Sequence, residues 1–247
     1  MEDSLGLEKL FFELASESRL AILNELQNEN LKMQEIARRL DVTATEAFRQ
    51  LERLSAAMLV QRLPDGNFAL APFGRLVLQL SSSLEFISKY RGYFSTHDLT
   101  KLPIQFLNRL AELAQTRLVT DTIEFLNLGE NAYAEMEQFG WGMAEGTIPQ
   151  HMLPVMDKKV DRGIRMKFIV PENRFETDTS AKPAKNLETR TLPELPAIIV
   201  LTEKVAGLCF RQMTGKMDYV GFFGTDETFR NWVKDLFQYY WERGKHV

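Results

Sequence analysis

The sequence contains little cysteine and histidine, and it has no long hydrophobic run. Its single cysteine, Cys209, excludes an intramolecular disulfide, and one cysteine with three histidines leaves few ligands for a zinc site. No apolar segment approaches the roughly 20 residues of a membrane-spanning helix, and the acidic start, Met1 to Ser4, is unlike a secretory signal. These absences predict a cytoplasmic protein with no metal, no cofactor and no membrane partner.

The remaining composition is that of an ordinary globular protein. The chain has 247 residues, is 45% hydrophobic and 26% charged, and carries a formal net charge of −4. Because Lys and Arg neutralise phosphates in nucleic-acid complexes, such a chain binds nucleic acid only where basic side chains gather locally. The pattern of the sequence changes near residue 95, which predicts two domains, residues 1–95 and residues 96–247.

The first domain has the pattern of a winged helix-turn-helix. Thr43 and Glu46 match a capping box, in which each side chain bonds the other residue's backbone amide at the start of a helix. The buried stripe of that helix is expected at Ala47, Leu51, Leu54 and Met58. Asp65 and Gly66 then form a hairpin-turn signal. The other expected elements are helices over residues 7–14, 19–27, 33–40 and 72–93, and strands over 59–63 and 68–71.

The outward face of the helix after Thr43 has the residue types of a DNA-recognition helix. Arg49 is the best candidate for a base contact, because Arg pairs with guanine through two hydrogen bonds. Thr45 suits a phosphate or a thymine methyl group, and Phe48 suits the methyl group. Residues 32–62 hold six basic and four acidic side chains, a local excess of positive charge. The predicted contacts to double-stranded promoter DNA are Arg38, Arg39, Thr43, Thr45, Phe48, Arg49, Arg53 and Arg62.

The second domain is predicted to be α/β, so that the whole chain is α/β, or α+β when the helical first domain is counted. Ligands of open α/β sheets bind beyond the carboxyl ends of strands, and the expected strand ending at Val170 leads into a long polar loop over residues 171–196. The predicted effector-binding residues are Trp141, Glu172, Arg174, Arg190, Arg211 and Asp218, and the three arginines suit an anionic small molecule. The expected elements are helices over 103–117, 149–162 and 229–241, and strands over 165–170, 197–201, 207–210 and 219–223.

Two helices are candidates for a homodimer interface. The final helix has seven apolar positions at helical spacing, more than one sheet face usually requires, and residues 74–93 form a second long apolar helix. A symmetric dimer would place two recognition helices about one helical turn of DNA apart.

Several motifs resemble a known family. The segment from Leu14 to Leu23 resembles the opening of archaeal ArsR-type winged helices, and the segment from Met33 to Val60 resembles their helix-turn-helix. Further motifs lie at 97–103, 190–196, 218–219 and 232–243, of which the last is the most specific. Together they resemble the archaeal methanogenesis-regulator family of transcription factors. That resemblance implies a ligand-responsive DNA-binding regulator whose C-terminal sensor domain has a catalytically dead, phospholipase-D-like fold.

Catalysis is not expected from the sequence. Phospholipase-D chemistry needs a His followed two residues later by Lys, and neither His97 nor His151 has one there. Cys209 lies in an apolar run and is expected to be a buried group rather than a reactive thiolate. The leading hypothesis is a homodimeric, sequence-specific, ligand-responsive transcriptional regulator. The alternatives are a winged-helix adaptor that binds a protein instead of DNA, and a catalytic C-terminal domain guided by a binding module.

Overall fold

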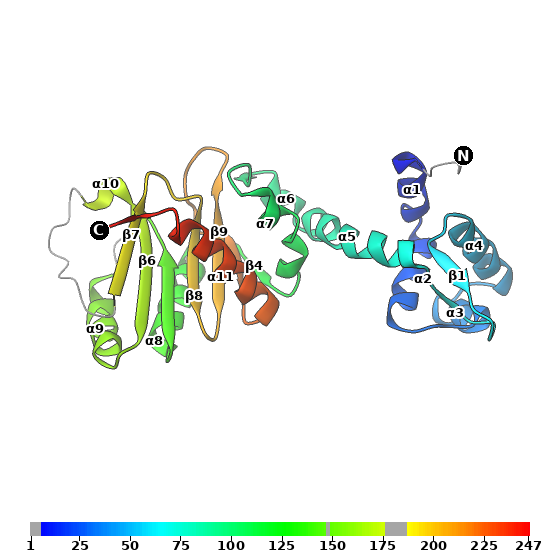
Figure 1. Ribbon diagram of the computed structural model, residues 1–247, viewed down its shortest axis with the longest axis horizontal. Coiled ribbons are helices and arrows are strands. Elements are labelled where there is room, and N and C mark those ends of the chain that lie inside the picture. The colour runs from blue at the N-terminus through cyan, green and yellow to red at the C-terminus, as the bar shows by residue number, and fades with distance from the viewer. Residues whose placement is uncertain (1–5, 147–148, 176–186) are drawn as a thin grey trace. The chain divides into compact units, whose positions relative to one another are not determined.

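The chain forms two compact units, which meet between Ser82 and Ser83 inside helix α5 (Pro72–Lys89). The computed structural model describes residues 6–146, 149–175 and 187–247 (Figure 1). The sequence predicts a boundary at residue 95 instead. The end of α5 goes with the second unit because the ring of Phe86 packs at a tilt against Phe222, with a centroid distance of 5.3 Å. Tyr93, just beyond α5, packs edge-on against the same ring at 5.0 Å.

The first unit is a winged helix-turn-helix, as predicted. Its elements before α5 are α1 (Leu7–Leu14), α2 (Glu17–Asn28), α3 (Met33–Arg39), α4 (Ala44–Ala56), β1 (Val60–Arg62) and β2 (Phe68–Leu70). Strands β1 and β2 pair antiparallel, and the turn between them contains Gly66 with φ of 85°, a conformation that glycine adopts without strain. The Asp65 carboxylate accepts a hydrogen bond from the Asn67 amide and closes this wing.

An apolar core and one buried arginine hold the first unit together. Leu23, Ile36 and Leu54 come from three different helices and are almost completely buried. Arg19 of α2 is also buried, with 6% of its surface exposed. Its guanidinium forms an ion pair with Glu13 at 2.9 Å and donates to Gln50 of α4, so that its charge is compensated where it is buried.

The second unit is an α/β domain built on one mixed sheet. The strands follow the order β11-β7-β6-β5-β8-β9-β10-β4, and β3 pairs with β9. Strands β5, β6 and β7 are parallel neighbours, whereas β8 is antiparallel to both β5 and β9. The carboxyl ends of β5, β6, β7 and β9 therefore lie at one edge. The strands are β3 (His97–Asp98), β4 (Arg117–Val119), β5 (Phe139–Met143), β6 (Arg165–Pro171), β7 (Leu187–Leu192), β8 (Ala197–Thr202), β9 (Ala206–Gln212), β10 (Gly221–Gly224) and β11 (Lys245–His246).

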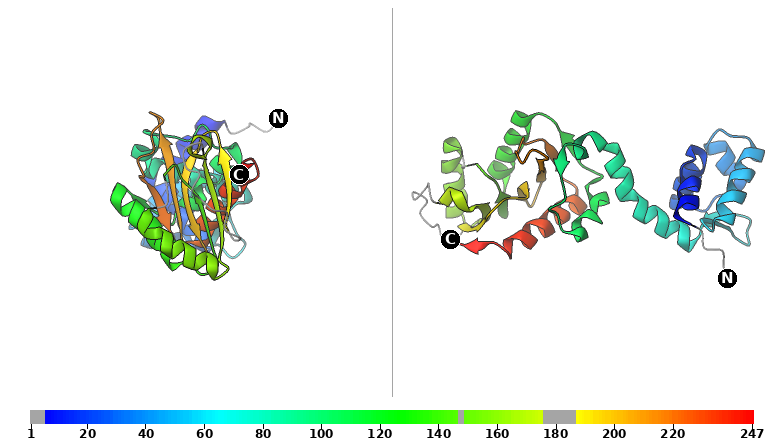
Figure 2. Two further views of the ribbon diagram at one scale, coloured as in Figure 1. Left: turned by 90° about the vertical axis from the view of Figure 1, so that its left-hand side faces the viewer. Right: turned by 90° about the horizontal axis from the view of Figure 1, so that it is seen from above.

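Helices cover both faces of this sheet (Figure 2). Successive residues of β8 point to opposite faces, so that Ile199 joins the core beneath α11 while Ile198 joins the core beneath α8. The helices of the unit after α5 are α6 (Arg91–Phe94), α7 (Ile104–Leu107), α8 (Thr122–Glu135), α9 (Leu153–Asp161), α10 (Glu172–Phe175) and α11 (Glu227–Trp241), with 3-10 turns η1 (Leu110–Leu113) and η2 (Gln150–Met152).

Helix α11 is covered by its own domain. Six of the seven apolar positions singled out in the sequence are buried against the sheet and η1, and only Tyr240 is partly exposed. The prediction that this helix has apolar side chains to spare for a dimer is therefore wrong. The twisted sheet together with η1 offers a wider apolar surface than one flat sheet face.

Three predicted elements differ in the structure. Residues 103–117 do not form one helix, because α7 and η1 are separate turns and Arg117 begins β4. The stretch after Pro171 is not wholly a polar loop, since β7 adds to the sheet beside β6 and buries Thr191 and Leu192. Residue 219 does not begin a strand, because Tyr219 has φ of 57° and β10 starts at Gly221.

Candidate nucleic-acid interface and effector cavity

Helix α4 is presented by a tight turn and a capped N-terminus. Asp41 has φ of 52°, and the Thr43 hydroxyl accepts a hydrogen bond from the Glu46 amide at 3.1 Å. Only this half of the predicted capping box forms, because the Glu46 carboxylate accepts hydrogen bonds from Arg49 and Gln50 instead. Met58 is also misplaced in the predicted buried stripe, since α4 ends at Ala56 and Met58 is 61% exposed.

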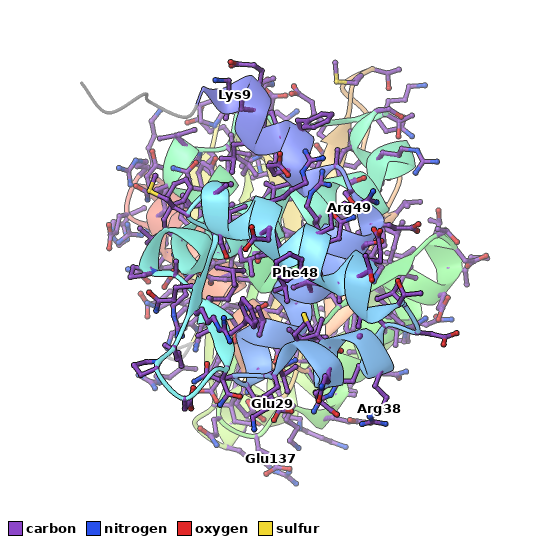
Figure 3. All side chains as sticks on the ribbon, turned by 90° about the vertical axis from the view of Figure 1, so that its right-hand side faces the viewer. Lys9, Glu29, Arg38, Phe48, Arg49 and Glu137 are labelled. Carbon is purple, nitrogen blue, oxygen red and sulfur yellow. The ribbon has the colours of Figure 1, made fainter. Side chains whose placement is uncertain are left out.

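Thr45, Phe48 and Arg49 are exposed residues of α4, and Figure 3 labels Phe48 and Arg49 on this helix. Phe48 is 51% exposed, so its ring is accessible to a ligand of this face. The Arg49 guanidinium is 69% exposed and lies 2.7 Å from the Glu46 carboxylate. Hydrogen bonds from Gln50 and Arg49 lower the pKa of Glu46, so this carboxylate is ionised at neutral pH. DNA would have to compete with an exposed ion pair, which costs little.

Two of the predicted DNA-contact arginines are engaged within the first unit. Arg39 contacts the carboxylates of Glu25, Glu29 and Glu35 at 2.9 to 3.0 Å and thereby joins α3 to α2. Arg53 points towards α1, where it lies 2.7 Å from Glu13. Its guanidinium also lies 5.2 Å from the ring of Phe12. Glu13, Glu25 and Glu29 fall outside the 32–62 window of the charge count, so local counting could not find these pairs.

The remaining two arginines stay closer to solvent. Arg38 is paired with Glu35 at 2.6 Å, yet its side chain is 73% exposed. Hydrogen bonds from Arg38 and Arg39 lower the pKa of Glu35 to about 2. Arg62 is exposed at the end of β1, with its guanidinium 6.0 Å from the Phe68 ring. The geometry thus leaves Arg38, Arg49 and Arg62 as the most accessible of the predicted basic contacts.

A polar cavity lies at the edge of the sheet where β5, β6, β7 and β9 end. It measures about 310 Å³ and is lined by Glu145, Pro171, Asn173, Pro193, Glu194, Leu195 and Arg211. Glu145 follows β5, Pro171 ends β6, Glu194 follows β7 and Arg211 is near the end of β9. This is the position at which ligands of open α/β sheets bind.

Arg211 is the predicted effector residue that lines this cavity. Its guanidinium contacts the carboxylates of Glu145 and Glu194 and the carbonyl oxygens of Leu195 and Gly215. Because two carboxylates already compensate this charge, Arg211 does not offer a free cationic site. The expectation of an anionic effector at this arginine is therefore not supported by its surroundings.

The other predicted effector residues lie elsewhere. Glu172 is paired with Lys245 at 2.9 Å, and Arg174 lies in α10 with its side chain outside the described part of the structure. Trp141 and Arg190 are on the sheet face beside α11. Asp218 lies 3.2 Å from the Nε2 atom of the buried His97. Sequence analysis did not predict that Glu145, Glu194 and Asn173 line the cavity. The one signal that could have found them is that they follow strands that run in the same direction.

No helix in the described ranges is long and apolar enough to cross a membrane. Among the same residues, no group of His, Cys, Asp or Glu side chains has the arrangement of a metal site. Cys209 is fully buried in β9, and burial raises the pKa of its thiol.

Solved structures give only distant likenesses. The archaeal chromatin protein TrmBL2, described with a novel mode of DNA binding, is 15% identical with a TM-score of 0.45 over 98% of this chain and 100% of its own. NucT from Helicobacter pylori is 11% identical with a TM-score of 0.44 over 54% of this chain and 99% of its own. An IclR transcriptional regulator from Alicyclobacillus acidocaldarius is 12% identical with a TM-score of 0.29 over 95% and 96%. Likenesses at this level do not indicate function.

Family comparisons are more informative, because they match both units. Residues 7–88 match the HVO_A0261 N-terminal domain, and residues 142–243 match the middle domain of the methanogenesis regulatory protein FilR1. Comparison with curated proteins found no match. The two matched domains follow one another in the order that the sequence motifs indicated, and the chain belongs to the methanogenesis-regulator family of winged-helix transcriptional regulators.

Proposed function

We propose that this protein is a sequence-specific regulator that binds double-stranded promoter DNA through α4. The observation that carries the proposal is the exposed face of Thr45, Phe48 and Arg49 on the second helix of a helix-turn-helix. Apolar residues on the opposite side of α4 anchor it in the core, so the polar and aromatic face is free for a major groove. The wing of β1 and β2 with Arg62 supplies a backbone contact.

The decisive experiment measures binding of the full chain to its own upstream promoter DNA by fluorescence anisotropy, with scrambled DNA of equal length. The Arg49→Ala variant should lose the preference for the promoter, about 1–3 kcal/mol for one base contact. Arg75→Ala is the matched control, because Arg75 is an exposed arginine that belongs to α5 rather than to α4. Equal and weak binding of both DNAs, unchanged by Arg49→Ala, would favour the adaptor hypothesis instead.

Ligand responsiveness is the second part of the proposal, and the cavity at the strand ends supports it. Its volume lies at the lower end of the range for small-molecule sites. Glu145 and Glu194 provide carboxylate oxygens, whereas Arg211 has most of its donors engaged. We infer a small polar effector that donates hydrogen bonds to these carboxylates. A transcriptional regulator must be in the same compartment as the DNA that it binds, and this agrees with the expected cytoplasmic location.

The third part of the proposal is a homodimer formed through α5. Leu76, Leu80 and Leu84 follow one another at four-residue spacing and are 59%, 75% and 56% exposed. Phe73 extends this stripe by one turn. Exposed apolar stripes of this kind are typical of helices that pair with another copy.

A further inference from the structure

The sheet face beside α11 is only partly covered at β6 and β7, where the end of the helix reaches Lys167 and Arg190 through Trp241. Helix α11 packs on β5, β8 and β9, and in Figure 1 no helix lies in front of β6 and β7. Met166 and Phe168 of β6 point to the opposite face, where they meet the core that includes Met156 of α9. By the alternation of a strand, Arg165 and Lys167 point to the open face.

Three basic side chains gather on this face around two tryptophans, and Arg165 lies on the same face of β6. The Lys167 ammonium lies 5.3 Å from the ring of Trp141 and 4.8 Å from that of Trp241. The Arg190 guanidinium lies 4.7 Å from Trp241, and the Lys234 ammonium lies 5.9 Å from Trp141. Cation–π contacts of this length attract each cation and hold it near the ring.

The charges of these cations are not neutralised by ion pairs. Within the ranges that the structure describes, Arg165, Lys167, Arg190 and Lys234 form no salt bridge. Arg190 donates instead to the Trp241 carbonyl oxygen and contacts His246, neither of which carries negative charge. The nearby carboxylates are Glu188, beside Lys167 in the register, and Glu172, which is occupied by Lys245.

We propose that this face, defined by Arg165, Lys167, Arg190 and Lys234, binds the phosphate backbone of double-stranded DNA as a second contact besides α4. The proposal rests on the DNA-binding function proposed above. A local group of unneutralised cations in a chain of net charge −4 is the electrostatic signature of phosphate binding.

Phosphates fit this face better than bases or a small effector. Trp241 is buried and Trp141 stacks on Phe237 at 5.1 Å, so the rings are not free to stack on unpaired bases. The face is an open sheet surface rather than a cavity, and small molecules prefer concave sites. Cations that stand apart on two strands and a helix suit a polyanion, because each can reach a different phosphate.

The test neutralises the face in the full chain with the triple variant Arg165→Gln, Lys167→Gln and Lys234→Gln. Binding to promoter and scrambled DNA is measured at several salt concentrations. Each lost phosphate contact lowers the slope of log K against log salt by about 0.9, so we expect a decrease approaching about 3. Affinity for both DNAs should fall by a similar factor, about tenfold or more, while the preference for the promoter remains.

The control variant changes Lys158, Arg162 and Lys216 to Gln. These three exposed cations lie on or next to α9 and in the turn after β9, and their loss changes the net charge equally. Lys167→Arg keeps the charge and the ring contact and should keep the slope, which separates binding from folding. Circular dichroism of each variant checks the fold.

An unchanged slope in the triple variant, or an equal decrease in the control, would overturn the proposal. Another contrary result is that inorganic phosphate changes the tryptophan fluorescence of the wild type while the triple variant keeps the wild-type slope of log K against log salt for DNA. In that case the face binds small anions rather than DNA, and the proposal is also overturned. Failure of the proposed function would look different, because the wild type would then show no preference for its promoter.

Discussion

At the scale of single residues, the contacts of Asp218 indicate a structural role. Burial raises its pKa, but hydrogen bonds from the Val220 amide, Gln212 and His97 together outweigh burial and hold the pKa below its ordinary value. His97 is held on its other side by the Tyr93 carbonyl oxygen at 2.9 Å, and its ring stacks on that of Tyr93. This carboxylate therefore ties β3, β9 and the end of α6 together, rather than facing a ligand cavity.

Asp218→Asn should lower the free energy of unfolding by about 2 kcal/mol at pH 7, because the hydrogen bonds lose a charged acceptor. The depressed pKa sets the sign of the pH dependence. The stabilisation is complete above the unfolded-state pKa near 4 and is lost as the pH falls through the lower folded-state value. In urea denaturation, the difference in unfolding free energy between the wild type and Asp218→Asn should therefore become smaller below about pH 4.

Asp157→Asn is the matched control for that measurement. Asp157 is exposed on α9, and its substitution should change the unfolding free energy by no more than about 0.5 kcal/mol. If the difference in unfolding free energy between the wild type and Asp218→Asn became larger at acid pH, the assigned role of the carboxylate would be contradicted.

At the scale of elements, the join between α4, β1 and α5 depends on a glycine. A Cβ atom on Gly74, in the first turn of α5, would lie 2.1 Å from the carbonyl oxygen of Leu59. Leu59 lies between α4 and β1 and accepts the Ala71 amide, so its backbone cannot move away without opening the wing. The close approach of two backbones explains why no side chain fits at position 74.

Gly74→Ala should therefore destabilise the first unit by about 2–3 kcal/mol, the usual cost of overpacking. Gly92→Ala is the matched helical control, because a Cβ atom on Gly92 of α6 meets nothing within 4 Å. That change should be neutral or slightly stabilising. Thermal unfolding followed by circular dichroism measures both, and equal melting temperatures for the two variants would contradict the packing argument.

At the scale of the whole molecule, the proposed homodimer requires an apolar interface between two copies. Burial of α11 removes one of the two helices that the sequence offered, and the leucine stripe of α5 remains. Leu80→Glu places a charge at its most exposed position and should convert a dimer to a monomer, because an unpaired charge in an apolar interface is costly. Sedimentation equilibrium measures the molecular mass of Leu80→Glu in solution. Its affinity for the promoter should be lower than that of the wild type.

Leu153→Glu is the control, because it replaces an exposed leucine outside α5 by glutamate. Leu153 begins α9 in the second unit and is 45% exposed. This variant should keep the mass and promoter affinity of the wild type. A dimer that persists in Leu80→Glu would mean that α5 is not the interface.

The sequence by itself determined the features that depend on a few neighbouring residues. The cap at Thr43, the hairpin turn at Gly66 and the helical stripe of α11 are all present in the structure. Each rests on hydrogen bonds between near neighbours or on a periodicity that one element must satisfy. Such local signals were sufficient to predict the winged helix-turn-helix and the α/β class of the second unit.

Only the tertiary structure decided which charged side chains meet. Arg39 of α3 finds two of its partners, Glu25 and Glu29, in and just after α2, and Arg211 finds Glu145 across 66 positions of the chain. Strand β7 forms in a polar stretch because β6 supplies its hydrogen-bonding edge. Ion pairs and strand partners are set by packing in space, which the local pattern does not encode. For this reason only the tertiary structure distinguishes the solvent-exposed Arg49 of α4 from Arg39 and Arg211, which several acceptors engage.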